Sequence, residues 1–163
     1  MNEQLVRIEL RVNSEQIDAE IPPHRGLLEF LREDLRLTGT KEGCETGVCG
    51  ICTILMDREP VKACLMLAVQ AQGRDLCTIE GIGADGVLTP IQDALVRHGG
   101  IQCGICTPAM VVTATALVEQ MPAPSEDAVR EFMAGTLCRC TGYQKIVDAI
   151  LAVTQQASGA ARP

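Results

Sequence analysis

Three cysteines lie close together in the stretch GCETGVCGIC, residues 43–52. Four residues separate Cys44 from Cys49, two separate Cys49 from Cys52, and Cys64 follows further along. A C-x2-C pair alone serves zinc, redox dithiols and iron–sulfur clusters alike. The wider order C-x4-C-x2-C…C is the spacing of plant-type [2Fe–2S] sites. These four cysteines are therefore predicted to ligate one [2Fe–2S] cluster.

Four more cysteines form a second set, with Cys103/Cys106 as one pair and Cys138/Cys140 as the other. Such tight pairs are typical of neighbouring ligands of one metal centre, so a second [2Fe–2S] cluster is predicted here. Structural zinc is the alternative, because four-cysteine zinc sites are common. Zinc ribbons usually contain two C-x2–4-C pairs. The C-x-C spacing of Cys138 and Cys140 and the long gap between Cys106 and Cys138 do not fit that pattern. Cys77 is left over and is interpreted as a small buried hydrophobe in a strand.

Glycines and helix starts surround these cysteines. Gly43, Gly47 and Gly50 allow a tight loop that aims backbone N–H groups at sulfur. In the second set, the helix starts expected at Thr107 and Thr141 favour negative charge nearby. Since a bound [2Fe–2S] cluster is anionic, such donors would stabilise it and tune its potential.

Composition excludes several classes of partner. The chain has 163 residues, a net charge of −7 and a sequence pI of about 4.8, so we expect no nucleic-acid or anionic-membrane partner. The longest apolar run, residues 109–118, is too short to span a membrane. An odd number of cysteines and no visible export signal disfavour a disulfide scaffold and predict a soluble, cytoplasmic protein. His24 and His98 are interpreted as surface residues.

The first half of the chain predicts a small mixed sheet packed on a helix. Residues 6–21 alternate as a hairpin that turns at Asn13-Ser14. The residues predicted to face inward are Val6, Ile8, Leu10 and Val12 before the turn and Ile17, Ala19 and Ile21 after it. A helix over 26–37 follows, with Leu27, Leu28, Leu31 and Leu35 on one face. The first half is completed by a second hairpin over 52–64, a short helix ending at Gly73 and a strand over 76–80.

The second half predicts helices only, in a pattern of helix, glycine, cysteine pair and helix that occurs twice. The expected helices cover about 90–98, 108–121, the stretch from the cap Ser125 to Gly135, and 142–156. Two such hairpins can pack as a four-helix bundle in which both cysteine pairs meet at one end. The fold class is thus α+β, with domains at 1–80 and 90–157, a linker at 81–89 and a flexible tail at 158–163. Halves of this size commonly need a metal to stabilise them.

Two longer motifs extend the pattern beyond the cysteines. The stretch RLTGTKEGCETGVCGICTILMD, followed by AVQAQGRDLCTIEG, resembles the ferredoxin half of the small subunit of xanthine oxidase-family molybdenum hydroxylases. IQCGICTPAMV and AGTLCRCTGYQKIVDAI resemble the second half of that subunit, and the resemblance covers about residues 4–156. It implies a β-grasp plant-type ferredoxin domain followed by a four-helix bundle, each holding one [2Fe–2S] cluster.

The resemblance also implies cofactors and partners. A large subunit would carry molybdopterin, as its cytosine dinucleotide, and a medium subunit would carry FAD, in a dimer of heterotrimers. The two clusters would relay single electrons between molybdopterin and flavin, with no catalysis by this chain alone. By motif position, Gln102 would hydrogen-bond the pterin, and the sulfur of Cys140 would also contact it. Neither the substrate nor the direction of electron flow is readable from this chain.

Some residues depart from the family pattern without removing a ligand: Ile51, Ile105, Ala109 and Thr136. Two other functions stay open from sequence alone. A free-standing two-cluster ferredoxin would have a mostly polar surface, whereas a subunit would keep an apolar face around Gln102 and Cys140. A zinc-stapled interaction module would be colourless.

Overall fold

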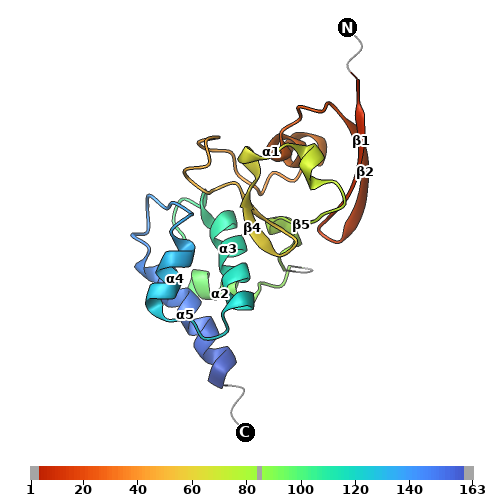
Figure 1. Ribbon diagram of the computed structural model, residues 1–163. Helices are drawn as coiled ribbons and strands as arrows, with labels where there is room; N and C mark the ends of the chain where they lie inside the picture. The colour runs from red at the N-terminus through yellow and green to blue at the C-terminus, as the bar shows by residue number, and fades with distance from the viewer. Residues whose placement is uncertain (1–3, 84–85, 160–163) are drawn as a thin grey trace.

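A mixed sheet and a group of helices make up the fold, and in Figure 1 the sheet lies at the upper right and the helices at the lower left. The structure is a computed structural model that describes residues 4–83, the sheet half, and 86–159, the helical half. The strands are β1 (Val6–Val12), β2 (Glu15–Ile21), β3 (Thr53–Met56), β4 (Glu59–Lys62) and β5 (Asp75–Cys77). The helices are α1 (Leu27–Glu29), α2 (Pro90–Arg97), α3 (Thr107–Gln120), α4 (Glu126–Met133) and α5 (Gln144–Gly159). The predicted order of a mixed sheet followed by helices is confirmed.

The hairpin of β1 and β2 has the predicted position and turn. Asn13 and Ser14 have φ angles of 51° and 71°, the backbone of a tight hairpin turn. Ile8, Leu10 and Val12 are buried, which fixes the register of the hairpin against the core. Val6 was expected to face inward as well but is 38% exposed, because it begins the strand at the open end of the hairpin.

The second hairpin, β3 and β4, completes a five-stranded sheet in the order β2-β1-β5-β3-β4. Its turn at Asp57 and Arg58 also has positive φ angles. The last strand is shorter than predicted: β5 ends at Cys77, and a 3-10 helix follows over Ile79–Gly81. Thr78 ends the strand because its N–H donates to the Asn13 side chain and its hydroxyl donates to Glu80.

The helix predicted over 26–37 is two different pieces. α1 covers one turn, and a π-helix over Phe30–Asp34 continues it, in which the Leu35 N–H donates to the Phe30 carbonyl. Leu27, Leu28 and Leu31 are buried as predicted, and Leu35 is half-buried. Phe30 is buried as well, so this segment fills the core of the sheet half from more than one face. The short helix expected before Gly73 is a 3-10 helix, Ala68–Ala71.

Helices α2 to α5 follow the predicted repeat closely. The Thr89 hydroxyl accepts from the Gln92 N–H to cap α2, and Ser125 caps α4 through the Ala128 N–H. The fourth helix begins later than predicted, at Gln144. Gly142 and Tyr143 both have left-handed backbone, with φ angles of 67° and 68°. A right-handed helix cannot include them, so α5 begins at the next residue, Gln144. At its other end α5 runs to Gly159, two residues into the predicted tail.

The two halves share a small core. Leu55 of β3 packs against Val112 and Ala116 of α3, so the sheet and the helical half are in direct contact. Figure 1 shows α3 lying beside β4. Residues 84 and 85 of the predicted linker and residues 160–163 of the predicted tail lie outside the described residues. No helix within 4–83 or 86–159 is long and apolar enough to cross a membrane.

Candidate metal centres

The first cysteine set gathers around the loop before β3. Cys44 accepts hydrogen bonds from the backbone N–H groups of Thr46 and Cys49, at 3.5 and 3.3 Å from its sulfur. Cys64 follows β4 and lies in hydrogen-bond contact with the Cys52 thiol. The structure thus brings Cys44 to Cys49 and Cys52 to Cys64. The prediction that this loop directs N–H groups at sulfur is confirmed for Cys44.

These contacts change the acidity of the thiols. Hydrogen bonds lower the pKa of Cys44 to about 6, first from the Thr46 side chain and then from the Cys49 backbone. Burial raises the pKa of Cys52 to about 11. The site therefore has one sulfur at which negative charge is stabilised by donors and another that is withdrawn from water. Donors at sulfur are also what an anionic cluster requires of its surroundings.

The second cysteine set meets at one end of the helices, as predicted. The sulfur atoms of Cys103 and Cys140 lie 3.5 Å apart, and Cys106 lies in hydrogen-bond contact with Cys138. Each contact joins one cysteine from each of the two loops. Cys103 and Cys140 are exposed, and we call them the outer pair; Cys106 and Cys138 are buried, and we call them the inner pair. Burial raises the pKa of Cys106 to about 12.

A closed set of hydrogen bonds holds Cys138. The Thr141 hydroxyl donates to the Cys138 sulfur at 3.1 Å, and the Tyr143 N–H donates to the Thr141 oxygen at 3.3 Å. The Tyr143 hydroxyl accepts the Cys138 N–H at 2.9 Å. Burial acts to raise the pKa of Cys138, but hydrogen bonds, led by the one from Thr141, outweigh it, so the pKa lies below its ordinary value.

Thr141 has a different role from the one predicted. It was expected to begin a helix whose dipole faces the cluster, and this is wrong because α5 begins at Gln144. The donor is the Thr141 side chain itself. The helix start at Thr107 is confirmed, and α3 follows Cys106 directly. Tyr143 was not predicted as a site residue. The sequence feature that could have indicated this role is that Tyr143 is the chain's single tyrosine and lies three residues after Cys140.

The surface around the outer pair is partly apolar. Gln102 is exposed beside Cys103. Ile105 and Leu137, which directly precede Cys106 and Cys138 in the sequence, are 49% and 47% exposed. The other departures from the family pattern are buried: Ile51, Ala109 and Thr136. The Thr136 hydroxyl lies 3.3 Å from that of Thr113, so it forms a hydrogen bond inside the protein.

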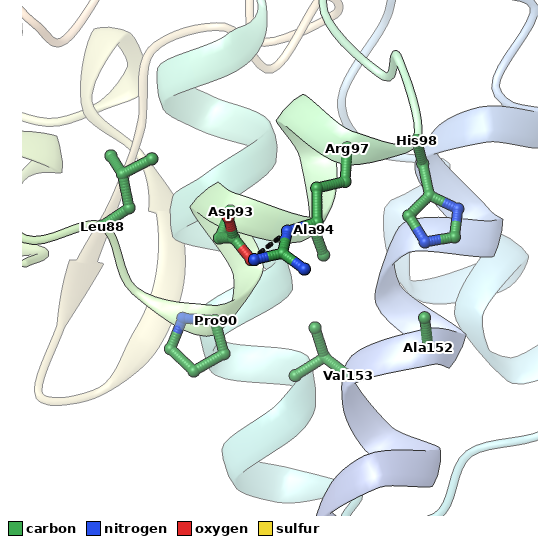
Figure 2. Close-up of a pocket in the computed structure, with 8 residues that line it drawn as sticks. All are labelled: Leu88, Pro90, Asp93, Ala94, Arg97, His98, Ala152 and Val153. Atoms are coloured by element: carbon green, nitrogen blue, oxygen red, sulfur yellow. Dashed lines mark ion pairs between the residues drawn. The ribbon is translucent and has the colours of Figure 1, made fainter.

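Cys77 and the histidines lie apart from both sets. Cys77 is half-buried beside the contact between Leu55 and α3, and burial raises its pKa. His24 and His98 are exposed, as predicted. His98 lines a pocket between α2 and α5 that Figure 2 shows, together with an ion pair of 2.8 Å between Asp93 and Arg97. No residue that lines this pocket belongs to the predicted sites.

The donor sets fit binuclear clusters. In each half four thiols lie as two contacting pairs. A [2Fe–2S] cluster held by four cysteines has two irons, so each iron would take two of the four thiols. Among the residues that the structure describes, no group of three or more His, Cys, Asp or Glu side chains is placed to hold a single metal ion.

Comparison with known proteins gives two matching families, one for each half. A family described as a 2Fe-2S iron-sulfur cluster binding domain matches residues 10–78. A second, described as a [2Fe-2S] binding domain, matches residues 78–151. Both halves therefore match iron–sulfur proteins, which argues against the zinc alternative.

The relatives agree over nearly the whole chain. The nicotine 6-hydroxylase small subunit of Paenarthrobacter nicotinovorans is 47% identical over 146 residues, which cover 90% of this chain and 88% of that one. The chain belongs to the small iron–sulfur subunits of xanthine oxidase-family molybdenum hydroxylases. A second member of this family, the caffeine dehydrogenase subunit gamma of Pseudomonas sp. (strain CBB1), is 46% identical over 150 residues, with 90% of both chains covered.

A solved structure of the family shows the same fold. One chain in the crystal structure of quinoline 2-oxidoreductase from Pseudomonas putida 86 matches with a TM-score of 0.90 and 48% identity. The match covers 96% of this chain and 98% of that chain. The resemblance inferred from the cysteine motifs is confirmed, and the chain is an electron-transfer subunit of an oxidoreductase complex.

Proposed function

We propose that this chain relays single electrons between a molybdopterin centre on a large subunit and a flavin on a medium subunit. The observation that carries the proposal is the gathering of eight cysteines into two four-thiol sites. When bound, each [2Fe–2S] cluster accepts and releases one electron at a time. The proposed ligands are Cys44, Cys49, Cys52 and Cys64 in the sheet half, and Cys103, Cys106, Cys138 and Cys140 in the helical half.

The folds that hold these sites follow the family pattern. We propose that the sheet half, residues 1–80, is a β-grasp ferredoxin domain. The helical half, residues 90–157, is proposed as a four-helix bundle, which is supported by packing of residues from α2, α3, α4 and α5 into one hydrophobic core. Residues 81–89 would link them. In both halves the protein supplies placement, exclusion of water and hydrogen bonds to sulfur, and the redox chemistry belongs to the clusters.

The outer pair faces the proposed molybdopterin subunit. Cys103 and Cys140 are exposed, and the apolar side chains of Ile105 and Leu137 in the same two loops are about half exposed. A partner surface there would bury these side chains and exclude water from the site. Gln102 and Cys140 are proposed to contact the pterin from this surface. Their exposure supports the proposal, because both side chains are accessible to a partner subunit.

The proposed complex contains the large molybdopterin subunit, as the cytosine dinucleotide form, and a medium FAD subunit, as a cytoplasmic dimer of heterotrimers. Relatives are named for nicotine, caffeine and quinoline. These names make nitrogen heterocycles the first substrates to test on the assembled enzyme. The substrate pocket itself would lie on the large subunit, so this chain contributes no specificity.

The test is purification of the tagged chain after co-expression with the neighbouring subunits. We expect a coloured complex with about four irons per copy of this chain, two for each four-cysteine site. A molybdenum-containing chain should co-purify in equal amount. A colourless protein that holds zinc, or a two-cluster chain that purifies alone as a stable monomer, would contradict the proposal.

A further inference from the structure

The strand β2 forms one edge of the sheet. The strand order is β2-β1-β5-β3-β4, and among the residues that the structure describes no strand pairs with the outer side of β2. Figure 1 shows the hairpin of β1 and β2 along the right-hand edge of the molecule, far from α4 and α5. The pairing of β2 with β1 runs without a bulge, and β2 contains no proline. It therefore lacks two features that commonly keep an edge strand from pairing further.

The backbone of β2 directs hydrogen-bonding groups to this outer side. On β1, the N–H groups of Arg11 and Glu9 donate to acceptors at residues 74 and 72, on the opposite side of β1 from β2. In an antiparallel pair, two opposing residues either bond to each other or both direct their N–H and C=O groups away. Gln16 lies opposite Arg11, and Asp18 lies opposite Glu9. The backbone groups of Gln16, Asp18 and, by the same alternation, Glu20 therefore face outward.

The apolar face of the hairpin is also incompletely covered along β2. Ile8 and Leu10 of β1 are each 1% exposed. Their partners on β2, Ala19 and Ile17, are only half-buried. A groove of about 650 Å³ lies beside these two residues, and the half-buried Leu35 lines it as well. A further strand laid along β2 would cover this apolar surface, and its removal from water would favour binding.

The charges on β2 select the kind of strand that fits. Its charged residues are all acidic: Glu15, Asp18 and Glu20. Arg7 of β1 donates to Asp18 at 2.9 Å, and Arg25, which lines the groove, is paired with Asp34. Like charges on neighbouring strands destabilise a sheet, and opposite charges stabilise it. A second copy of β2 would place carboxylates beside carboxylates, whereas a strand with basic residues would complement them.

We propose that β2 is the docking edge for an extended segment of another subunit of the complex, in which basic and apolar residues alternate. The backbone of this segment pairs with Gln16, Asp18 and Glu20. Its basic side chains lie beside the acidic side chains of β2 on one face, and its apolar side chains cover Ile17 and Ala19 on the other. The inference goes beyond the proposed function, because it requires only that the chain belongs to a complex.

Hydrogen exchange in the assembled complex tests the backbone pairing, when mass spectrometry resolves single amides. The amides of Ile17 and Ala19 are the internal reference, because they bond to β1 whether or not a segment is docked. We expect the amides of Gln16, Asp18 and Glu20 to exchange as slowly as this reference. Exchange of these three amides at the fast rate of a solvent-exposed edge would overturn the proposal.

Photo-cross-linking identifies the occupant in the purified complex. A p-benzoylphenylalanine placed at position 16 lies on the outer edge of β2. We expect a cross-link to a segment of another subunit in which basic and apolar residues alternate. A cross-link to a second copy of this chain, or no cross-link at all, overturns the proposal.

A pair of charge reversals tests the selection for basic residues. Glu20→Lys reverses a charge on β2, and Glu131→Lys reverses an exposed carboxylate on α4 as the matched control. We expect the amides of Gln16 and Asp18 to exchange faster in Glu20→Lys and at the wild-type rate in Glu131→Lys. Slow exchange of the reference amides shows that the hairpin itself is intact. Unchanged exchange in Glu20→Lys, or an equal rise in the control, contradicts the charge match. A wild-type complex without about four irons per chain instead overturns the proposed function.

Discussion

Replacing Thr141 with valine removes one hydroxyl beside Cys138 and keeps the size of the side chain. That hydroxyl donates to the Cys138 sulfur at 3.1 Å. A reduced cluster carries one more negative charge than an oxidised one, and part of it lies on the sulfur ligands. A donor at sulfur therefore stabilises the reduced state more than the oxidised state. Thr141→Val is expected to lower the midpoint potential of the helical-half cluster.

The size of the shift follows from the energy of one hydrogen bond. A typical net contribution is about 1 kcal/mol. A one-electron couple changes by about 59 mV for each tenfold change in equilibrium constant, which is about 1.4 kcal/mol. If the hydrogen bond stabilises the reduced state by this full amount and the oxidised state not at all, its loss lowers the potential by about 40 mV. If the hydrogen bond stabilises the two redox states more equally, the shift in potential is smaller in proportion.

The assay is a redox titration of the complex followed by EPR, in which the two clusters give separate signals. Thr115→Val is the matched control, because the Thr115 hydroxyl donates to the Val111 carbonyl within α3, at 2.9 Å, and not to sulfur. The sheet-half cluster should keep its potential in both variants. An unchanged or raised potential in Thr141→Val, or an equal fall in Thr115→Val, would refute the reasoning.

Three further substitutions test the assignment of the sites. Cys140→Ser should abolish or cripple the helical-half cluster and spare the other, so that iron per chain falls by about half; unchanged iron content and visible spectrum would remove Cys140 from the ligands. Cys77→Ala should retain both clusters, because Cys77 lies outside both cysteine sets; lost iron would require a new assignment. Gln102→Ala should keep both clusters but weaken co-purification with the molybdenum-containing subunit, and wild-type assembly and turnover would count against that contact.

Local signals in the sequence were enough for much of this molecule. Cysteine spacing identified both four-thiol sets, because the ligands of a compact cluster come from short loops with restricted geometry. The cap at Thr89 marked the start of α2, since capping depends on residues only a few positions apart. The two hairpin turns were found from their turn residues for the same reason.

The features that the sequence did not reveal depend on contacts between distant residues. Thr78 ends β5 because Asn13, which is remote in sequence, accepts its N–H. The site role of Tyr143 arises only when its left-handed backbone turns the hydroxyl toward the Cys138 N–H. Gly50 was expected to shape its own loop. A Cβ atom at this position would lie 1.9 Å from the carbonyl oxygen of Gly135 in the other half, so no local pattern could have predicted that glycine is necessary there.

The exposure of Cys103 and Cys140 also constrains the order of biogenesis. The site to which they belong opens to solvent on the surface where the large subunit is proposed to dock. Iron and sulfide can be inserted through this opening only while it is uncovered. Maturation of the helical half should therefore precede association with the catalytic subunit, and that subunit would then seal the metal centre inside the finished enzyme.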